Sequence, residues 1–173
     1  KPLPPIASFA PNQGIFISST SKILAPGLRL AVIHCPQTAY PLIKESLYGM
    51  QIAPPALMMQ LFTRMILSGR FDEIRSLRIQ DLEQRNQIFD EIIKDFKNTG
   101  DFHSPIRWIQ IPTSITPAQF EALALSHNLQ VYSADRFIVG SESIPNAIRV
   151  SLISAEKIED YRTGLQILEK LLS

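Results

Sequence analysis

The stretch Ile17-Ser-Ser-Thr-Ser-Lys-Ile-Leu-Ala-Pro-Gly-Leu-Arg29 lies between two short apolar runs, Gly14–Ile17 and Leu30–His34. Continuous apolar runs bounded by turn residues predict two short buried strands. Between them, a hydroxyl-rich turn carries one lysine, Lys22, and a Pro-Gly turn precedes Arg29. The predicted loop between the strands therefore presents an amine and a guanidinium close together in the sequence.

These residue types suit a phosphorylated aldehyde as ligand. A lysine amine forms a Schiff base with an aldehyde, while hydroxyls and an arginine fork bind a phosphate. Lys22 would supply the amine, and Arg29 would supply the guanidinium that binds the phosphate. The hydroxyl donors would be Ser18, Ser19 and Ser21. The alternative is a surface lysine in a polar turn and an arginine in a surface salt bridge.

Composition excludes several other functions. A net charge of +1 over 173 residues gives no electrostatic case for nucleic-acid or membrane binding by this segment. The single cysteine, Cys35, excludes an internal disulfide framework and suits the reducing cytoplasm. No apolar run approaches the roughly 18 residues of a membrane helix, and no secretory signal is visible. The opening Lys1-Pro-Leu-Pro-Pro5 has no initiator Met, so we expect a piece of a longer protein.

Hydrophobic periodicity predicts five helices and four further strands. The helix over 54–67 has a wide apolar face and should be well buried. The helix over 71–97 should span about 40 Å, with Arg85 on its solvated side. A Thr116 cap, Pro117 and Gln119 predict a capping box. The remaining helices are predicted at 38–48, 117–128 and 155–172, and the strands at 106–111, 129–132, 137–139 and 147–152.

This order predicts an α/β protein in three parts. Residues 1–70 would hold the last strands of a larger domain, and 71–100 a long connecting helix. Residues 101–173 would form a small lobe with helices on one face of a mainly antiparallel sheet.

Two segments resemble a known family. Ser18-Ser-Thr-Ser-Lys22-Ile-Leu-Ala-Pro-Gly-Leu-Arg29-Leu is similar to the cofactor-lysine motif of fold-type I pyridoxal-phosphate aminotransferases. Pro145-Asn-Ala-Ile-Arg149-Val-Ser-Leu, with the helix that follows, resembles the segment that carries their carboxylate-binding arginine. Gly69-Arg-Phe71, the 107–112 run and the 129–137 run look most like the MocR branch of the GntR transcription regulators. In that branch, an aminotransferase-like domain follows a winged-helix DNA-binding domain.

The resemblance implies specific roles. Lys22 would bind pyridoxal phosphate and, in an enzyme, move the substrate proton. Ser19, Ser21 and Arg29 would hold the phosphate. Arg149 would bind a substrate carboxylate in a bidentate pair, whereas its alternative is an ordinary cross-strand ion pair.

The resemblance also implies partners and limits. The effector would be amino-acid-like or a vitamer, DNA would bind through an N-terminal winged helix, and the protein would be a cytoplasmic homodimer. The ring-binding residues of such a site lie upstream of the cofactor lysine. We therefore expect these 173 residues alone to bind the cofactor poorly, to catalyse nothing and to self-associate through exposed apolar faces.

Two other functions stay open. The chain is alternatively the C-terminal part of a free-standing class I aminotransferase, or a scaffold that has lost the chemistry. No metal site is predicted, because the three histidines and Cys35 lack ligand spacing. Trp108 and Tyr132 are assigned to the core rather than to recognition.

Overall fold

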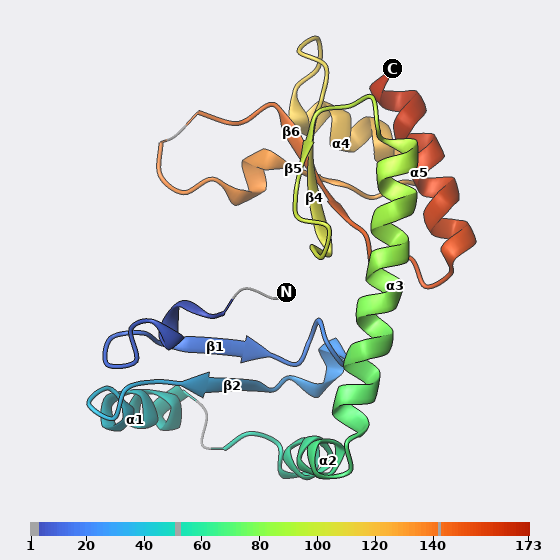
Figure 1. Ribbon diagram of the computed structural model, residues 1–173. Helices are drawn as coiled ribbons and strands as arrows, with labels where there is room; N and C mark the ends of the chain where they lie inside the picture. The colour runs from blue at the N-terminus through green and yellow to red at the C-terminus, as the bar shows by residue number, and fades with distance from the viewer. Residues whose placement is uncertain (1–3, 51–52, 142) are drawn as a thin grey trace. The chain divides into compact units, whose positions relative to one another are not determined.

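The computed structural model describes residues 4–50, 53–141 and 143–173. The chain divides into two compact units, Lys1–Arg78 and Ile79–Ser173. Figure 1 shows an α/β arrangement in each, with a two-stranded sheet in the first unit and a four-stranded sheet in the second. No helix among the described residues is both long enough and apolar enough to cross a membrane.

The first unit holds the two predicted strands, β1 (Phe16–Ser19) and β2 (Ala31–His34). They pair antiparallel, with Phe16 opposite His34 and Ser19 opposite Ala31. The prediction that they are buried is wrong, since most of their residues, Ile17 among them, are exposed. Apolar runs of this kind are typical of strands covered on both faces, and the described residues supply no such cover.

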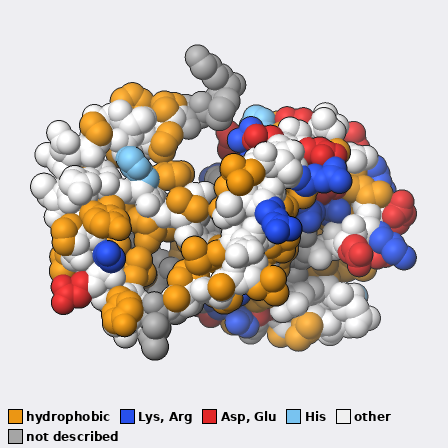
Figure 2. All heavy atoms as spheres, turned by 90° about the horizontal axis from the view of Figure 1, so that it is seen from below, with side chains coloured by type: hydrophobic (Ala, Val, Ile, Leu, Met, Phe, Trp, Pro, Cys, Tyr) orange, Lys and Arg blue, Asp and Glu red, His pale blue; other side chains and the backbone are white. Residues whose placement is uncertain are grey.

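Helices α1 (Tyr40–Met50) and α2 (Ala56–Leu67) also belong to the first unit, and neither has a buried residue. The expected burial of the second helix is therefore wrong. Leu57, for example, is 73% exposed. Figure 2 views the molecule from the side of these helices and shows hydrophobic side chains gathered over them. The wide apolar face predicted from the sequence is present, but no described element covers it.

Helix α3 (Arg70–Ile92) starts after Ser68 and Gly69, as the sequence predicts. Gly69 has a left-handed backbone, with φ of 75°, which glycine adopts without steric cost. The helix ends at Ile92 rather than at the predicted Lys97. The reason is that Lys97 already belongs to the sheet region, where its carbonyl accepts a hydrogen bond from the Gln110 N–H at 2.9 Å.

The sheet of the second unit is wholly antiparallel, in the order β3-β4-β6-β5. Its strands are β3 (Asn98–Thr99), β4 (Ile106–Gln110), β5 (Tyr132–Ser133) and β6 (Ala147–Ser151). The predicted strand at 137–139 is wrong. In its place, the chain after β5 turns into a short 3₁₀ helix, η3 (Ala134–Phe137), which the Glu121 carboxylate holds through Ser133 and Arg136.

The core of the second unit lies between this sheet and three helices. Figure 1 shows α3, α4 (Pro117–Ser126) and α5 (Ile158–Leu172) on one side of the sheet and η3 on the other. The predicted capping box at Thr116 and Gln119 is confirmed. Buried side chains on the helix side of the sheet include Ile109, Ile148, Phe89, Phe120 and Leu165.

Candidate functional site

The loop between β1 and β2 carries the predicted cofactor residues. Thr20 closes its base, because its backbone N–H and its hydroxyl both donate to the Leu30 carbonyl, at 3.0 and 2.9 Å. Leu24, Leu28 and Leu30 are buried along with Ala7 in the same unit. The loop is thus closed at its base by Thr20 and holds three buried leucines.

The serines beside Lys22 bind one another rather than the rest of the chain. The Ser19 hydroxyl lies 3.1 Å from that of Ser21 and accepts from the Ser21 N–H at 3.2 Å. Lys22 is exposed. Within the part of the chain that the structure describes, its amine has no hydrogen bond or ion pair. An amine and two neighbouring hydroxyls are therefore available to a ligand.

Arg29 is held in an unusual backbone conformation. Its φ of 51° and ψ of 37° place it in the left-handed region, which costs a residue other than glycine roughly 1–2 kcal/mol. Its side chain is exposed and, across residues 4–50, 53–141 and 143–173, pairs with no carboxylate. The surface salt bridge considered for Arg29 is therefore absent there. Strain of this kind is typical of functional positions.

An apolar hollow of about 890 Å³ lies between β2 and α1. Arg29, Ala31 and Ile33 line one part of it, and Tyr40 and Tyr48 line another. Lys44 and Glu45 also line it, so Arg29 borders a mainly apolar hollow that contains one acidic side chain.

Arg149 lies on β6 in the second unit, on the sheet face away from the helices. Its cross-strand neighbours are Trp108 on β4 and Tyr132 on β5. Both are aromatic, so the cross-strand ion pair considered for Arg149 is wrong. Its guanidinium carbon lies 5.4 Å from the ring centroid of Tyr132 and 4.9 Å from that of Phe137.

Arg149 also has an unsatisfied donor. Its Nε is buried and has no hydrogen-bond partner among the described residues. A buried donor left unpaired costs about 1–3 kcal/mol. Because the guanidinium of Arg149 has no carboxylate partner among the described residues, its charge is available to an anion.

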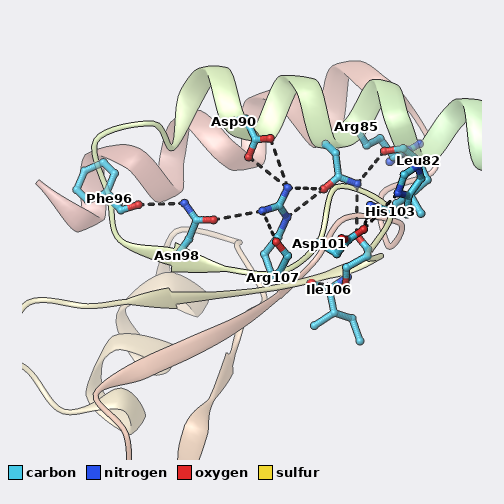
Figure 3. Close-up of polar contacts among 12 residues, drawn as sticks. Leu82, Arg85, Asp90, Phe96, Asn98, Asp101, His103, Ile106 and Arg107 are labelled. Carbon is cyan, nitrogen blue, oxygen red and sulfur yellow. Dashed lines mark hydrogen bonds and ion pairs between the residues drawn. The ribbon is translucent and has the colours of Figure 1, made fainter. Parts of the chain in front are cut away.

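Arg107, one residue before Trp108, faces the helix side and is fully engaged (Figure 3). It donates to Asn86 Oδ1 from Nε at 3.0 Å and from Nη2 at 2.7 Å. It also reaches the Asn98 side chain, the Gly100 carbonyl and the Asp90 carboxylate. Arg107 is therefore structural, in contrast to Arg149.

Arg85 is a second buried arginine, so its predicted place on the solvated side of α3 is wrong. It pairs with Asp81 at 3.0 Å and donates to the carbonyls of Leu152 and Ala155. The Tyr161 hydroxyl donates to the Arg85 carbonyl at 3.0 Å, and burial raises the pKa of that hydroxyl. These contacts tie α3 to the chain that leads from β6 into α5.

Trp108, Tyr132 and Phe137 are the functional candidates that the sequence reasoning missed. It assigned Trp108 and Tyr132 to the core, whereas both lie around Arg149 and are only partly buried. Strand alternation gave a signal for Trp108, because Arg107 and Ile109 face the opposite side. No local signal placed Phe137 there, since it lies outside any strand.

No group of three or more histidine, cysteine or acidic side chains suited to a metal occurs among the described residues.

The predicted site residues are divided between the two units. The first unit holds Lys22, Ser19, Ser21 and Arg29, and the second holds Arg149.

Comparison with solved structures identifies the class of fold. The multiple-substrate aminotransferase of Thermococcus profundus matches with a TM-score of 0.81 and 16% identity, over 91% of this chain and 40% of that one. The α-aminoadipate aminotransferase LysN of Thermus thermophilus matches with a TM-score of 0.77 and 21% identity, over 96% of this chain and 44% of that one. The chain has the fold of an aminotransferase-like C-terminal domain.

A sequence relative comes from a different functional class. The uncharacterized HTH-type transcriptional regulator YdeF of Bacillus subtilis (strain 168) is 37% identical over 171 residues. The match covers 99% of this chain and 37% of that protein, so the chain spans little more than a third of its relative. No family model matches the chain. The chain is thus a homologue of part of an HTH-type regulator and has an aminotransferase-like fold.

Proposed function

We propose that the chain is the C-terminal, pyridoxal-phosphate-binding effector domain of a MocR-type regulator of the GntR family. The observation that carries this proposal is the pairing of an aminotransferase fold with 37% identity to an HTH-type regulator. DNA would bind through a winged helix outside these 173 residues, in keeping with the net charge of +1 found here. The protein would act in the cytoplasm.

The loop between β1 and β2 suits the cofactor chemically. Lys22 would hold pyridoxal phosphate, with Ser19, Ser21 and Arg29 on its phosphate. The free amine, the paired hydroxyls and the strained Arg29 backbone support these roles. When bound, the cofactor supplies an aldehyde that reacts with primary amines and a ring that withdraws electrons. The LysN structure is described as a complex with a phosphopyridoxyl-leucine compound.

Arg149 would bind the carboxylate of an amino-acid-like effector or vitamer. The lack of a carboxylate partner among the described residues and the aromatic rings beside the guanidinium support this role. A guanidinium binds a carboxylate through two parallel hydrogen bonds, which fixes the orientation of the ligand.

Substitution of the lysine tests the proposal in the intact protein. Wild type should show the visible absorption of bound cofactor. Borohydride, which reduces an imine to a stable amine, should attach the cofactor permanently to Lys22. Lys22→Ala should abolish both this absorption and the effect of an amino compound on DNA affinity. Lys94→Ala, which removes an exposed lysine of the second unit, is the control and should change neither. An unchanged response in Lys22→Ala would favour the scaffold function instead.

A free-standing aminotransferase is the second candidate, and the solved aminotransferases of similar fold favour it. It predicts transfer of an amino group from an amino acid to a 2-oxo acid, with no DNA binding by the intact protein.

The 173 residues alone are expected to bind pyridoxal phosphate poorly, because the resemblance places the ring contacts elsewhere.

The functional protein would be a homodimer. Exposed hydrophobic side chains on β1, α1 and α2 support association of this unit with other protein surface. Light scattering of the 173-residue chain should show a mass that rises with concentration. A constant monomer mass would contradict this expectation.

A further inference from the structure

The guanidinium of Arg149 contacts two aromatic rings. Tyr132 reaches it from the neighbouring strand β5, and Phe137 reaches it from the end of η3. The guanidinium carbon lies over both rings, 5.4 Å from the Tyr132 centroid and 4.9 Å from that of Phe137. Contacts of this geometry attract a cation to the ring face. Together they restrict the directions in which the guanidinium can present its donors.

Phe137 is itself supported. The Trp108 ring meets it edge to face, with 5.3 Å between the centroids and 85° between the planes. Trp108 also lies directly across from Arg149 in the sheet. The three aromatic residues and Arg149 therefore form one cluster on the sheet face away from the helices.

Glu121 on α4 sets the position of η3. Its carboxylate accepts from the Ser133 N–H at 2.8 Å and from the Arg136 Nε at 3.1 Å. The Glu121 side chain is only 18% exposed. Burial on its own would raise the pKa of Glu121, but the hydrogen bonds from Arg136 and Ser133 outweigh it and hold the pKa below its usual range. The carboxylate thus stays ionised and keeps η3 in place.

The other arginines with described partners in this unit differ from Arg149. Arg85, Arg107 and Arg136 each pair with a carboxylate. Among the residues that the structure describes, Arg149 has aromatic neighbours and no carboxylate partner. Rings therefore orient this cation without occupying its donors.

We propose that Phe137 and Tyr132 are positioning residues that hold Arg149 ready for a carboxylate, and that Glu121 fixes Phe137 through η3. This inference rests on the proposed carboxylate-binding role of Arg149. The ligand class is a carboxylate that meets the guanidinium beside an aromatic wall. Phe137 and Tyr132 act through Arg149 and need not touch the carboxylate.

NMR of the intact protein with ¹⁵N-labelled arginine provides the test, with sodium acetate as the probe. The Arg149 Nε–H signal is identified by its loss in Arg149→Lys. It should exchange slowly with water, because Nε is buried, and should be shifted by the two rings. Phe137→Leu should move this signal and weaken acetate binding about three- to tenfold. Phe137→Tyr keeps an aromatic ring and should therefore match wild type in both the Arg149 signal and the acetate affinity.

The controls separate positioning from general damage. Phe102→Leu removes a partly exposed ring that contacts His103 rather than Arg149, and should leave the signal and the acetate affinity unchanged. Phe137→Met keeps apolar bulk if the leucine variant does not fold. Glu121→Gln should move the Arg149 signal in the same direction as Phe137→Leu.

The outcomes distinguish this inference from the proposed function. If Arg149→Lys abolishes acetate binding while Phe137→Leu and Tyr132→Leu change neither the signal nor the affinity, the inference is overturned and the role of Arg149 stands. If the ring variants move the signal but wild type binds no acetate, the rings do orient Arg149 and its carboxylate role fails.

Discussion

The Asn86 side-chain oxygen accepts two hydrogen bonds from Arg107, which join the C-terminal half of α3 to the inner strand β4. Arg107 is 5% exposed and Asn86 is fully buried. A guanidinium buried this deeply needs its acceptors, because water cannot replace them. The amide of Asn86 therefore stabilises a charge inside the core without carrying charge itself.

Asn86→Ala should lower the free energy of unfolding by about 2–3 kcal/mol, since it removes two hydrogen bonds to a charged, buried group. Urea denaturation of the isolated chain measures the change. Gln166→Ala, which removes an exposed amide from α5, is the control and should have little effect. Equal stability of the two variants would contradict the role given to Asn86.

Gly100→Ala should destabilise the second unit more than Gly140→Ala. Both glycines have positive φ, 142° and 78°, so both substitutions strain the backbone. Only at Gly100 would the new Cβ meet a side chain, at 2.6 Å from Arg107 Cδ. We expect a cost of at least about 1 kcal/mol beyond that of Gly140→Ala, measured as the difference between their urea midpoints.

The stability of the chain should fall in acid partly through Glu121. Its pKa is lowered in the folded state, from an ordinary value of 4.5. Its contribution is therefore complete above about pH 4.5 and is lost as the pH falls through the lower folded value. Glu121→Gln should be less stable than wild type at neutral pH, and the difference should shrink in acid. A difference in melting temperature between the two proteins that stays the same at every pH would contradict this.

Arg29→Gly should have opposite effects on stability and on cofactor binding. Glycine relieves the left-handed backbone, so the free energy of unfolding should rise by up to about 1 kcal/mol. Loss of the guanidinium should weaken binding of pyridoxal phosphate to the intact protein. Arg29→Ala is the matched control, because it removes the same charge but keeps the strain. It should weaken binding without stabilising the fold.

Features set by neighbouring residues were predicted well from the sequence. The Thr116 capping box and the two strands around Lys22 depend on residues within one turn or one run. The break at Gly69 is equally local. For these elements, side-chain chemistry and backbone preference agree with the final fold.

Features set by distant partners were not predicted. Arg85 looked solvated because the carbonyls that bind it belong to Leu152 and Ala155, far along the chain. The run around Phe137 has the local pattern of a strand. It forms a 3₁₀ helix instead, and the Glu121 carboxylate that holds this helix comes from α4, which the local pattern does not reveal. The apolar runs of β1 indicated burial, yet the layer that would cover them is absent from the described residues.

Trp108 is the only tryptophan in the sequence, and it contacts Phe137 next to Arg149 on the sheet. Intrinsic fluorescence excited selectively at the indole therefore reports on this one face. A ligand that reaches Arg149 should change the emission without any introduced label.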